Sequence, residues 1–131
     1  FLFMIKISLL LISIFSLLYG LVFSFAPYFF AELTQADTTN IAWLRNIGAS
    51  ICGVLFLGLL YVYRSPSKNY DLFMIITVTS ILQTLGLIFS RFYNEFSAQN
   101  KFVIDFTIYS AVFVSFYLVY ILLNYKSIFK K

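Results

Sequence analysis

The distribution of apolar and polar residues divides the chain into four long apolar segments separated by short polar ones. A helix needs about 20 predominantly apolar residues to cross a hydrocarbon core of about 30 Å. The first apolar run also exceeds the roughly 7 to 15 residues of a signal-peptide core, so we expect it to be a span. The pattern predicts an all-α integral membrane four-helix bundle, a single transmembrane domain over residues 1–131, with spans at residues 7–26, 41–63, 70–90 and 102–124.

The amino-acid composition agrees with this prediction. Hydrophobic residues make up 62% of the chain and charged residues only 11%, whereas soluble domains have about 45 to 50% and about 25%. A water-soluble fold of this size could not bury that much apolar surface. Membrane lipids are therefore the expected surroundings of the chain.

Charged residues are unequally distributed between the two ends of the predicted spans. The net charge is +4, and six of the nine Lys and Arg residues fall on the side that holds both chain ends: Lys6, Arg64, Lys68, Lys126, Lys130 and Lys131. By the positive-inside rule, both termini then face the cytoplasm. A bacterial inner membrane is the favoured location and a mitochondrial inner membrane the alternative. The basic residues form no dense run, so we expect no nucleic-acid partner.

The residue types present restrict the chemistry. The chain has one cysteine, Cys52, so an internal disulfide, a Cys-x-x-Cys redox pair and a thiolate metal cluster are excluded. Histidine is absent, which removes imidazole ligation of heme or zinc and the commonest general base near neutral pH. We therefore expect neither an enzyme nor a protein with a metal or cofactor.

Small residues are expected to hold the helices together. Inside lipid, helices associate mainly through close backbone packing and interhelical polar contacts. The first span offers a stripe of small residues on one face, and the second offers two overlapping pairs. The predicted packing residues are Ser16, Gly20, Ser24, Gly48, Ala49, Cys52 and Gly53.

A short sequence recurs in the first and third spans. Residues 20–24 read Gly-Leu-Val-Phe-Ser, and residues 86–90 read Gly-Leu-Ile-Phe-Ser. Each precedes a connector and another span, which would fit two hairpins related by an axis along the membrane normal. Coincidence explains the recurrence equally well in a chain so rich in these residues.

Four polar residues are candidates for a site near the outer face. Arg45 and Asn46 lie about one turn inside the second span, and Asp105 lies at a similar depth in the fourth. A charge at the bilayer centre costs about 2.5 to 3.5 kcal/mol, so such residues are usually paired or functional. We expect an ion pair between Arg45 and Asp105, with Asn46 and Gln83 close by and Arg91 and Glu95 above them. This cluster would fix the helix register or line a pocket for a lipid headgroup or anionic ligand; separate snorkelling side chains are the third interpretation.

The connector at residues 27–40 has an aromatic first half and a polar second half. Tyr28, Phe29, Phe30 and Leu33 are expected to lie in the membrane interface as an ordinary elbow, with a lid over an outer pocket as the alternative. The polar half ends in residues that favour the N-cap of the second span.

The start of the second span carries a resemblance to a known family. The segment Trp43-Leu44-Arg45-Asn46-Ile47-Gly48-Ala49, with the Arg64-Ser65-Pro66 turn, resembles a family of small bacterial four-helix inner-membrane proteins of unknown function. The resemblance covers mainly the second and third spans and implies a four-helix bundle without an assigned activity. Other four-span families fit less well. Small multidrug transporters, for example, carry a glutamate in the first span, which has no acidic residue here.

Three functions are compatible with these features. The first is an accessory or structural subunit of a larger membrane complex, whose partners are other integral membrane proteins or further copies of the chain. The second is a carrier for a lipid or hydrophobic ligand that enters near Arg45, Gln83 and Asp105. The third is a small transporter or channel that works as an oligomer, because a single four-helix unit is narrow.

Overall fold

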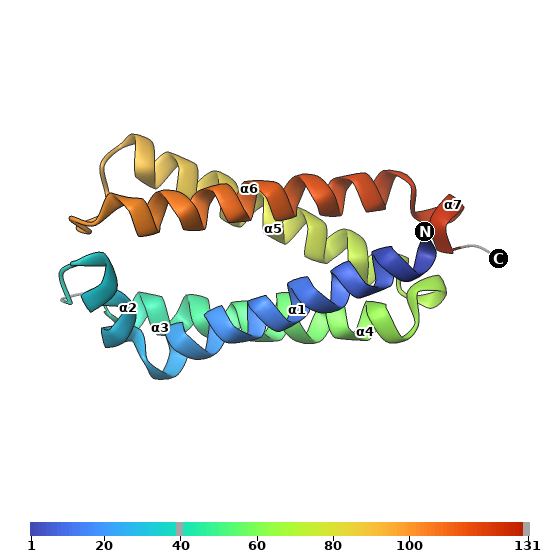
Figure 1. The fold of residues 1–131 in the computed structure, drawn as a ribbon, viewed down its shortest axis with the longest axis horizontal. Helices are drawn as coiled ribbons and strands as arrows, with labels where there is room; N and C mark the ends of the chain where they lie inside the picture. Colours follow the sequence, from blue (N-terminus) through green and yellow to red (C-terminus); the bar gives the residue numbers. More distant parts are fainter. Residues whose placement is uncertain (39–40, 130–131) are drawn as a thin grey trace.

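The computed structural model describes residues 1–38 and 41–129, and Figure 1 shows their fold. These residues form no strand, and four helical segments among them are long and apolar enough to cross a membrane. The segments are α1 (Leu2–Phe25), the continuous run of α3 (Ile41–Ser50), the π-helix η1 (Ile51–Leu57) and α4 (Gly58–Arg64), then α5 (Tyr70–Phe92) and α6 (Lys101–Leu123). The predicted all-α architecture with four apolar helices is confirmed.

Three short helices lie at the ends of the long ones. They are α2 (Pro27–Thr34), the 3-10 turn η2 (Pro66–Lys68) and α7 (Tyr125–Phe129). The first long helix also begins earlier than expected, at Leu2 instead of residue 7. A lone Lys6 does not interrupt it, because its ammonium lies 5.5 Å from the centre of the Tyr63 ring, where a cation is stabilised.

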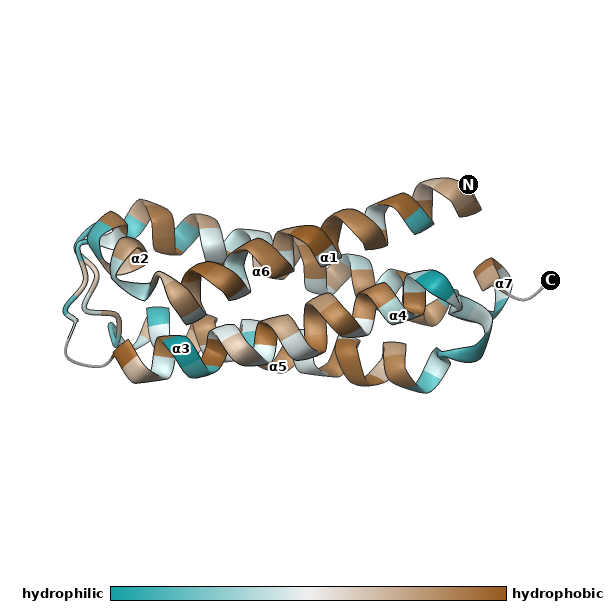
Figure 2. Ribbon diagram, turned by 90° about the horizontal axis from the view of Figure 1, so that it is seen from below, coloured by the Kyte–Doolittle hydropathy of each residue, from teal (hydrophilic) through white to brown (hydrophobic). Residues whose placement is uncertain are grey.

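The four spans are arranged as two antiparallel pairs (Figure 1). In one pair α1 lies along α3, η1 and α4, and in the other α5 lies along α6. Phe1 and α7 lie at one end of the bundle, here called the terminal end; the opposite end, with residues 26–38 and 93–100, is called the connector end. Apolar residues dominate the helices along their length, and polar residues gather at both ends (Figure 2).

The contact between α1 and the second span is close enough to exclude side chains. A Cβ atom added to Gly20 would lie 2.4 Å from the Cys52 sulfur, and one added to Gly48 would lie 2.5 Å from the Ser24 hydroxyl oxygen. The same Gly48 Cβ would be 2.8 Å from the carbonyl oxygen of Gly20. The two backbones therefore touch directly, and four of the predicted packing residues lie in this one contact.

The other predicted packing residues lie outside that contact. Ala49 and Gly53 are exposed, and a Cβ at Gly53 would meet no atom within 4 Å. Ala49 directly follows Gly48, and Gly53 directly follows Cys52. One step along a helix turns the side chain by about 100°, so both positions point away from the contact. The Ser16 hydroxyl donates to the carbonyl of Ile12 in its own helix, at 2.8 Å.

The main apolar core lies at the terminal end. It combines residues from all four spans and from α7: Ile5, Leu9, Leu59, Val62, Phe73, Ile76, Leu118, Ile121, Tyr125 and Phe129. A smaller cluster of Ala98, Ile104 and Ile108 lies at the connector end, between α6 and the preceding connector. The two helix pairs are therefore joined by side-chain packing mainly where the chain begins and ends.

Hydroxyl groups supply further contacts between helices. Ser115 on α6 lies 2.9 Å from both Ser80 and Thr84 on α5, and all three side chains are buried. The fully buried Ser13 on α1 donates to the carbonyl of Phe56 in η1, at 2.9 Å. Such bonds satisfy polar groups that have no access to water in a bilayer.

Backbone hydrogen bonds tie the two connectors together. The amide of Asn100 donates to the carbonyl of Thr34 at 3.0 Å, and the amide of Gln99 donates to that of Gln35 at 3.3 Å. Of the four residues expected in the membrane interface, Tyr28, Phe29 and Leu33 on α2 are exposed, whereas Phe30 is half-buried with its ring centre 4.6 Å from that of Phe23. The interfacial position of α2 stays a prediction. Residues 39 and 40, expected to favour the N-cap of the second span, lie outside the described residues, as do Lys130 and Lys131.

Candidate functional site

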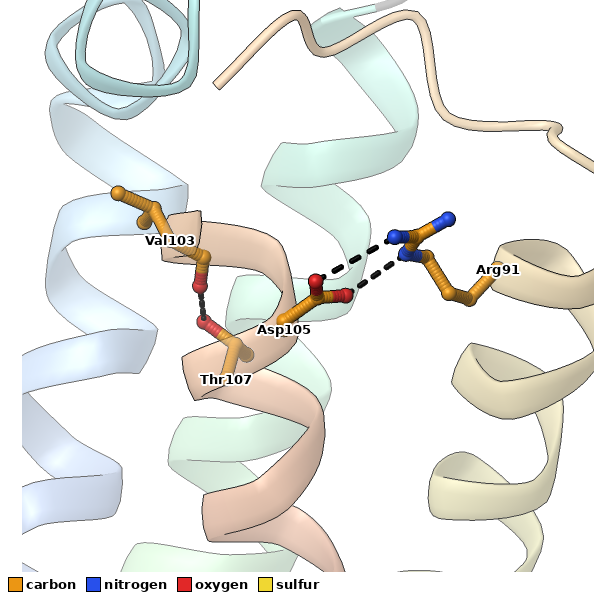
Figure 3. A network of polar contacts seen from close by, with 4 residues as sticks. All are labelled: Arg91, Val103, Asp105 and Thr107. Atoms are coloured by element: carbon orange, nitrogen blue, oxygen red, sulfur yellow. Dashed lines mark hydrogen bonds and ion pairs between the residues drawn. The ribbon is translucent and has the colours of Figure 1, made fainter. Parts of the chain in front are cut away.

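A salt bridge joins α5 to α6 at the connector end. The Arg91 Nε donates to Asp105 Oδ1 at 2.7 Å, and Arg91 Nη2 donates to Oδ2 at 3.3 Å (Figure 3). Arg91 is in the last turn of α5, and Asp105 is about one turn inside α6. A short connector links these antiparallel helices, so the two side chains reach the same depth of the bundle. Their pairing lowers the cost of holding both charges near the edge of the apolar region.

Both partners of the salt bridge remain accessible. The exposed fractions of the two side chains are 34% for Arg91 and 37% for Asp105. An arginine has five N–H groups, and only two of those on Arg91 bond to Asp105. The other three make no hydrogen bond with the described residues, so this guanidinium can bind a second acceptor.

Two hollows adjoin the Arg91 side chain. One has a volume of about 120 Å³ and is lined by Ile88, Arg91, Asp105, Ile108 and Tyr109. The other, of about 10 Å³, is lined by Arg91, Asn94, Phe96, Ala98, Lys101 and Ile104. The turn after α5 shapes the second hollow, because Asn94 has a left-handed backbone, with φ 55°, and Glu95 donates its amide to the carbonyl of Ser90.

The expected ion pair between Arg45 and Asp105 is wrong, because Asp105 pairs with Arg91. Arg45 Nη1 instead donates to the carbonyl oxygen of Ser24, at 2.5 Å. That carbonyl lies in the last turn of α1, where the break before Pro27 removes the next helical donors. Arg45, which lies on α3, therefore caps the end of α1, the helix against which α3 packs.

The other two residues of the expected cluster do not complete it. The Asn46 side chain is exposed, and its backbone carbonyl accepts the Ser50 hydroxyl at 3.3 Å. Gln83 is half-buried on α5, and its amide makes no hydrogen bond with another described residue. The four-residue pocket on which a ligand carrier was predicted is therefore not formed, and its charged residues take part in two separate contacts.

The outward face of α6 carries an aromatic stripe. Seven residues with exposed fractions of 48% to 80% follow one another at alternating steps of four and three: Phe102, Phe106, Tyr109, Phe113, Phe116, Tyr120 and Leu123. We call this set the α6 stripe. All members but the last are aromatic. On α5, exposed residues at the same spacing are mostly aliphatic: Ile75, Val78, Leu82, Leu85, Phe89 and Phe92.

Two of these features had readable signals that the sequence analysis did not use. Arg91 and Asp105 flank one short connector, and that spacing alone places them at matching depths. The α6 stripe is visible as aromatic residues repeating every 3.5 positions over residues 102–123. The cap between Arg45 and Ser24 had no comparable signal, because it depends on which faces of α1 and α3 meet.

Comparisons with protein-family models, with curated proteins and with solved structures found no match to this chain. The resemblance to a family of small bacterial four-helix membrane proteins therefore stays a prediction.

Proposed function

We propose that the protein is a small accessory subunit of a larger membrane complex and that it docks onto a partner transmembrane helix through the α6 stripe. The proposal rests on one observation, the six exposed aromatic residues on a single face of α6. No reaction is required of the chain in this role, and no cofactor. The partner is another integral membrane protein.

Aromatic and aliphatic side chains differ in how strongly they favour contact between helices in a membrane. Aliphatic side chains such as those on α5 are well solvated by lipid tails, so they give little reason for helices to associate. Aromatic rings present large rigid areas, have few rotatable bonds to immobilise, and gain energy from ring packing beyond the area they bury. An aromatic face on one helix of four therefore favours protein contact over lipid contact.

The spacing of the stripe fits a helical partner. Residues repeating every 3.5 positions follow a slightly left-handed path on an α-helix, because the ideal repeat is 3.6. A second helix crossing at about 20° follows the same path, which is the commonest packing geometry in membrane bundles. The stripe extends along nearly all of α6 (Lys101–Leu123), so the partner contact would cross most of the bilayer.

The orientation and location belong to the same proposal. Both termini are placed in the cytoplasm, because the terminal end carries Lys6, Arg64, Lys68 and Lys126. A bacterial inner membrane is the proposed location, with a mitochondrial inner membrane as the alternative. In either case the salt bridge between Arg91 and Asp105 lies near the opposite membrane surface.

Purification at native abundance in a mild detergent tests the proposal. We expect a stoichiometric protein partner to co-migrate with the wild-type chain and to be identified by mass spectrometry. The double variant Phe113→Leu/Phe116→Leu keeps the segment apolar but removes two central rings, so it should weaken partner binding at least about tenfold, which corresponds to about 1.4 kcal/mol.

The matched control is Phe15→Leu/Phe89→Leu, which makes the same change at exposed positions on α1 and α5. This variant should retain the partner at the wild-type level. Equal loss from both double variants would contradict the role of α6, and a wild-type chain that migrates alone would contradict the subunit itself. A second copy of this chain as the co-migrating species would make the protein a homo-oligomer.

A further inference from the structure

We propose that the 120 Å³ hollow between α5 and α6 is a binding site for the phosphate group of a membrane phospholipid, held by Arg91, with Lys101 of the adjoining hollow adding positive charge beside it. The polar residues that line this site are Arg91, Asp105 and Tyr109, and Arg91 is the cationic one. Two of its five N–H groups hold Asp105, and three remain for an acceptor. A phosphate oxygen pair is a suitable acceptor, because it matches the planar fork of an arginine.

Asp105 positions Arg91 and does not remove its binding capacity. The two-bond contact between them fixes the guanidinium plane at the edge of the hollow. The carboxylate offsets one positive charge, and the exposed Lys101, which lines the neighbouring hollow beside Arg91, supplies another. The site thus keeps an excess of one positive charge for one anionic group.

The remaining walls of the hollow are suited to the apolar part of a lipid. Ile88 and Ile108 line it on the α5 and α6 sides, and Tyr109 adds an exposed ring with a hydroxyl group. A volume of about 120 Å³ is many times the 10 to 15 Å³ that one water needs, yet it cannot hold whole acyl chains. The headgroup would occupy the hollow while the chains stay in the bilayer beside the helices.

The depth of the site agrees with a headgroup. The 23 residues of α5 span about 35 Å at 1.5 Å per residue, slightly more than a hydrocarbon core of about 30 Å. Arg91 is the second-to-last residue of that helix, so it lies at the depth where the lipid headgroup phosphates begin. The exposed rings of Phe92 and Tyr93 flank it, as aromatic residues do at the membrane interface.

Thermal unfolding of the purified full-length chain in mild detergent tests this site with three probes. Dioleoyl phosphatidylglycerol in mixed micelles should raise the unfolding midpoint by at least about 2 °C, because a ligand that binds only the folded state stabilises it. Dioleoylglycerol, which has the same chains and no phosphate, should cause no rise. Sodium phosphate, matched in ionic strength with sodium chloride, should cause none either.

Variants separate binding from the structural role of the salt bridge. Arg91→Gln and Asp105→Asn both break the salt bridge, but only Arg91→Gln removes the guanidinium that is proposed to bind the phosphate. We therefore expect Arg91→Gln to lose the response to phosphatidylglycerol and Asp105→Asn to keep or increase it. Lys101→Gln, which breaks no hydrogen bond between described side chains, should raise the lipid concentration needed by about fivefold. Arg64→Gln, at the terminal end, should respond as the wild type.

Several results would overturn the proposal: a normal response in Arg91→Gln, an equal loss in Arg91→Gln and Asp105→Asn, or a rise with dioleoylglycerol. A rise with sodium phosphate alone would overturn the lipid assignment and make a soluble phosphate compound the ligand. If Arg91→Gln does not fold, the responses of Asp105→Asn and Lys101→Gln decide in its place. These readouts do not involve the α6 partner, so their failure leaves the proposed subunit role standing.

Discussion

Tyr125 illustrates how one residue joins separate parts of the terminal end. Its hydroxyl donates to the carbonyl of Pro66 at 2.5 Å, which ties α7 to the turn between α4 and α5. Its ring lies 5.2 Å from those of Tyr70 and Phe73 and 4.7 Å from that of Phe129, measured between ring centres. The residue is only 3% exposed, and burial raises the pKa of Tyr125 from 10.0 to about 12.

We expect Tyr125→Phe to lower the free energy of unfolding by about 0.5 to 1.5 kcal/mol at neutral pH, because the ring packing stays and one hydrogen bond is lost. The wild type should also lose stability between pH 10 and pH 12. In that range the tyrosine ionises in the unfolded chain but stays neutral in the folded one, so unfolding is favoured by at most about 3 kcal/mol. Below pH 10 this contribution is constant.

The measurement is the thermal unfolding midpoint in detergent from pH 8 to pH 12 for both proteins. Other tyrosines and the lysines also ionise above pH 10, so the informative quantity is the difference between wild type and variant. That difference should shrink as the pH rises through the interval and reverse before pH 12, because the full loss from ionisation exceeds the hydrogen-bond contribution. A constant difference over the whole range would show that Tyr125 titrates normally.

Depth along a helix was predictable for single residues, but direction around it was not. The sequence correctly indicated that Arg45, Arg91 and Asp105 lie near the ends of spans. Which arginine reaches the carboxylate depends on the faces that meet, and α6 packs on α5 while α3 packs on α1. Charge and hydropathy patterns do not show which faces meet, although the short connector between Arg91 and Asp105 places these two residues at matching depths.

At the scale of helices, the close contact of α1 with α3 predicts unequal effects of adding a methyl group. Gly48→Ala would place its Cβ 2.5 Å from the Ser24 hydroxyl oxygen and 2.8 Å from a backbone carbonyl, so the helices must separate. Overpacking of this kind costs about 1 to 3 kcal/mol. Gly53→Ala and Gly86→Ala meet no atom within 4 Å and should be neutral or slightly stabilising, because alanine favours helix.

Unfolding midpoints of the three alanine variants in one detergent provide the comparison. The close contact is refuted if Gly48→Ala is as stable as Gly86→Ala. Gly86, compared with Gly20, also shows what a local sequence motif cannot predict. Gly20 and Gly86 begin nearly identical five-residue segments, yet Gly20 touches the facing backbone and Gly86 is exposed. A local motif does not determine which of its copies faces another helix.

Other features of the helices also separate into those that the sequence predicted and those that it did not. The lengths of the second, third and fourth spans followed from apolar runs, and the end of α1, but not its start, followed from Pro27. The π-helix at Ile51–Leu57 was not predicted, because no pattern in its sequence marks it, and the Ser13 hydroxyl that donates to its Phe56 carbonyl comes from another span. Such a partner is known only once the helices are assembled.

For the whole molecule, the pattern of apolar and polar segments was sufficient to predict four apolar helices, and it did not determine their arrangement in two pairs. Packing between the pairs is concentrated at the terminal end, while hydrogen bonds between connectors join them at the other. This frame leaves the outward face of α6 free, with its aromatic stripe exposed along the length of the helix. We propose that another membrane protein covers this face of α6.

Site-specific photo-crosslinking in native membranes tests that claim most directly. A photoreactive phenylalanine analogue at position 113 lies in the middle of the stripe, and the same analogue at position 89 lies on the exposed face of α5. We predict a discrete protein adduct from position 113 and only lipid adducts from position 89. Lipid adducts alone from both positions would contradict the account, because they would show that the α6 stripe faces the bilayer and not a partner.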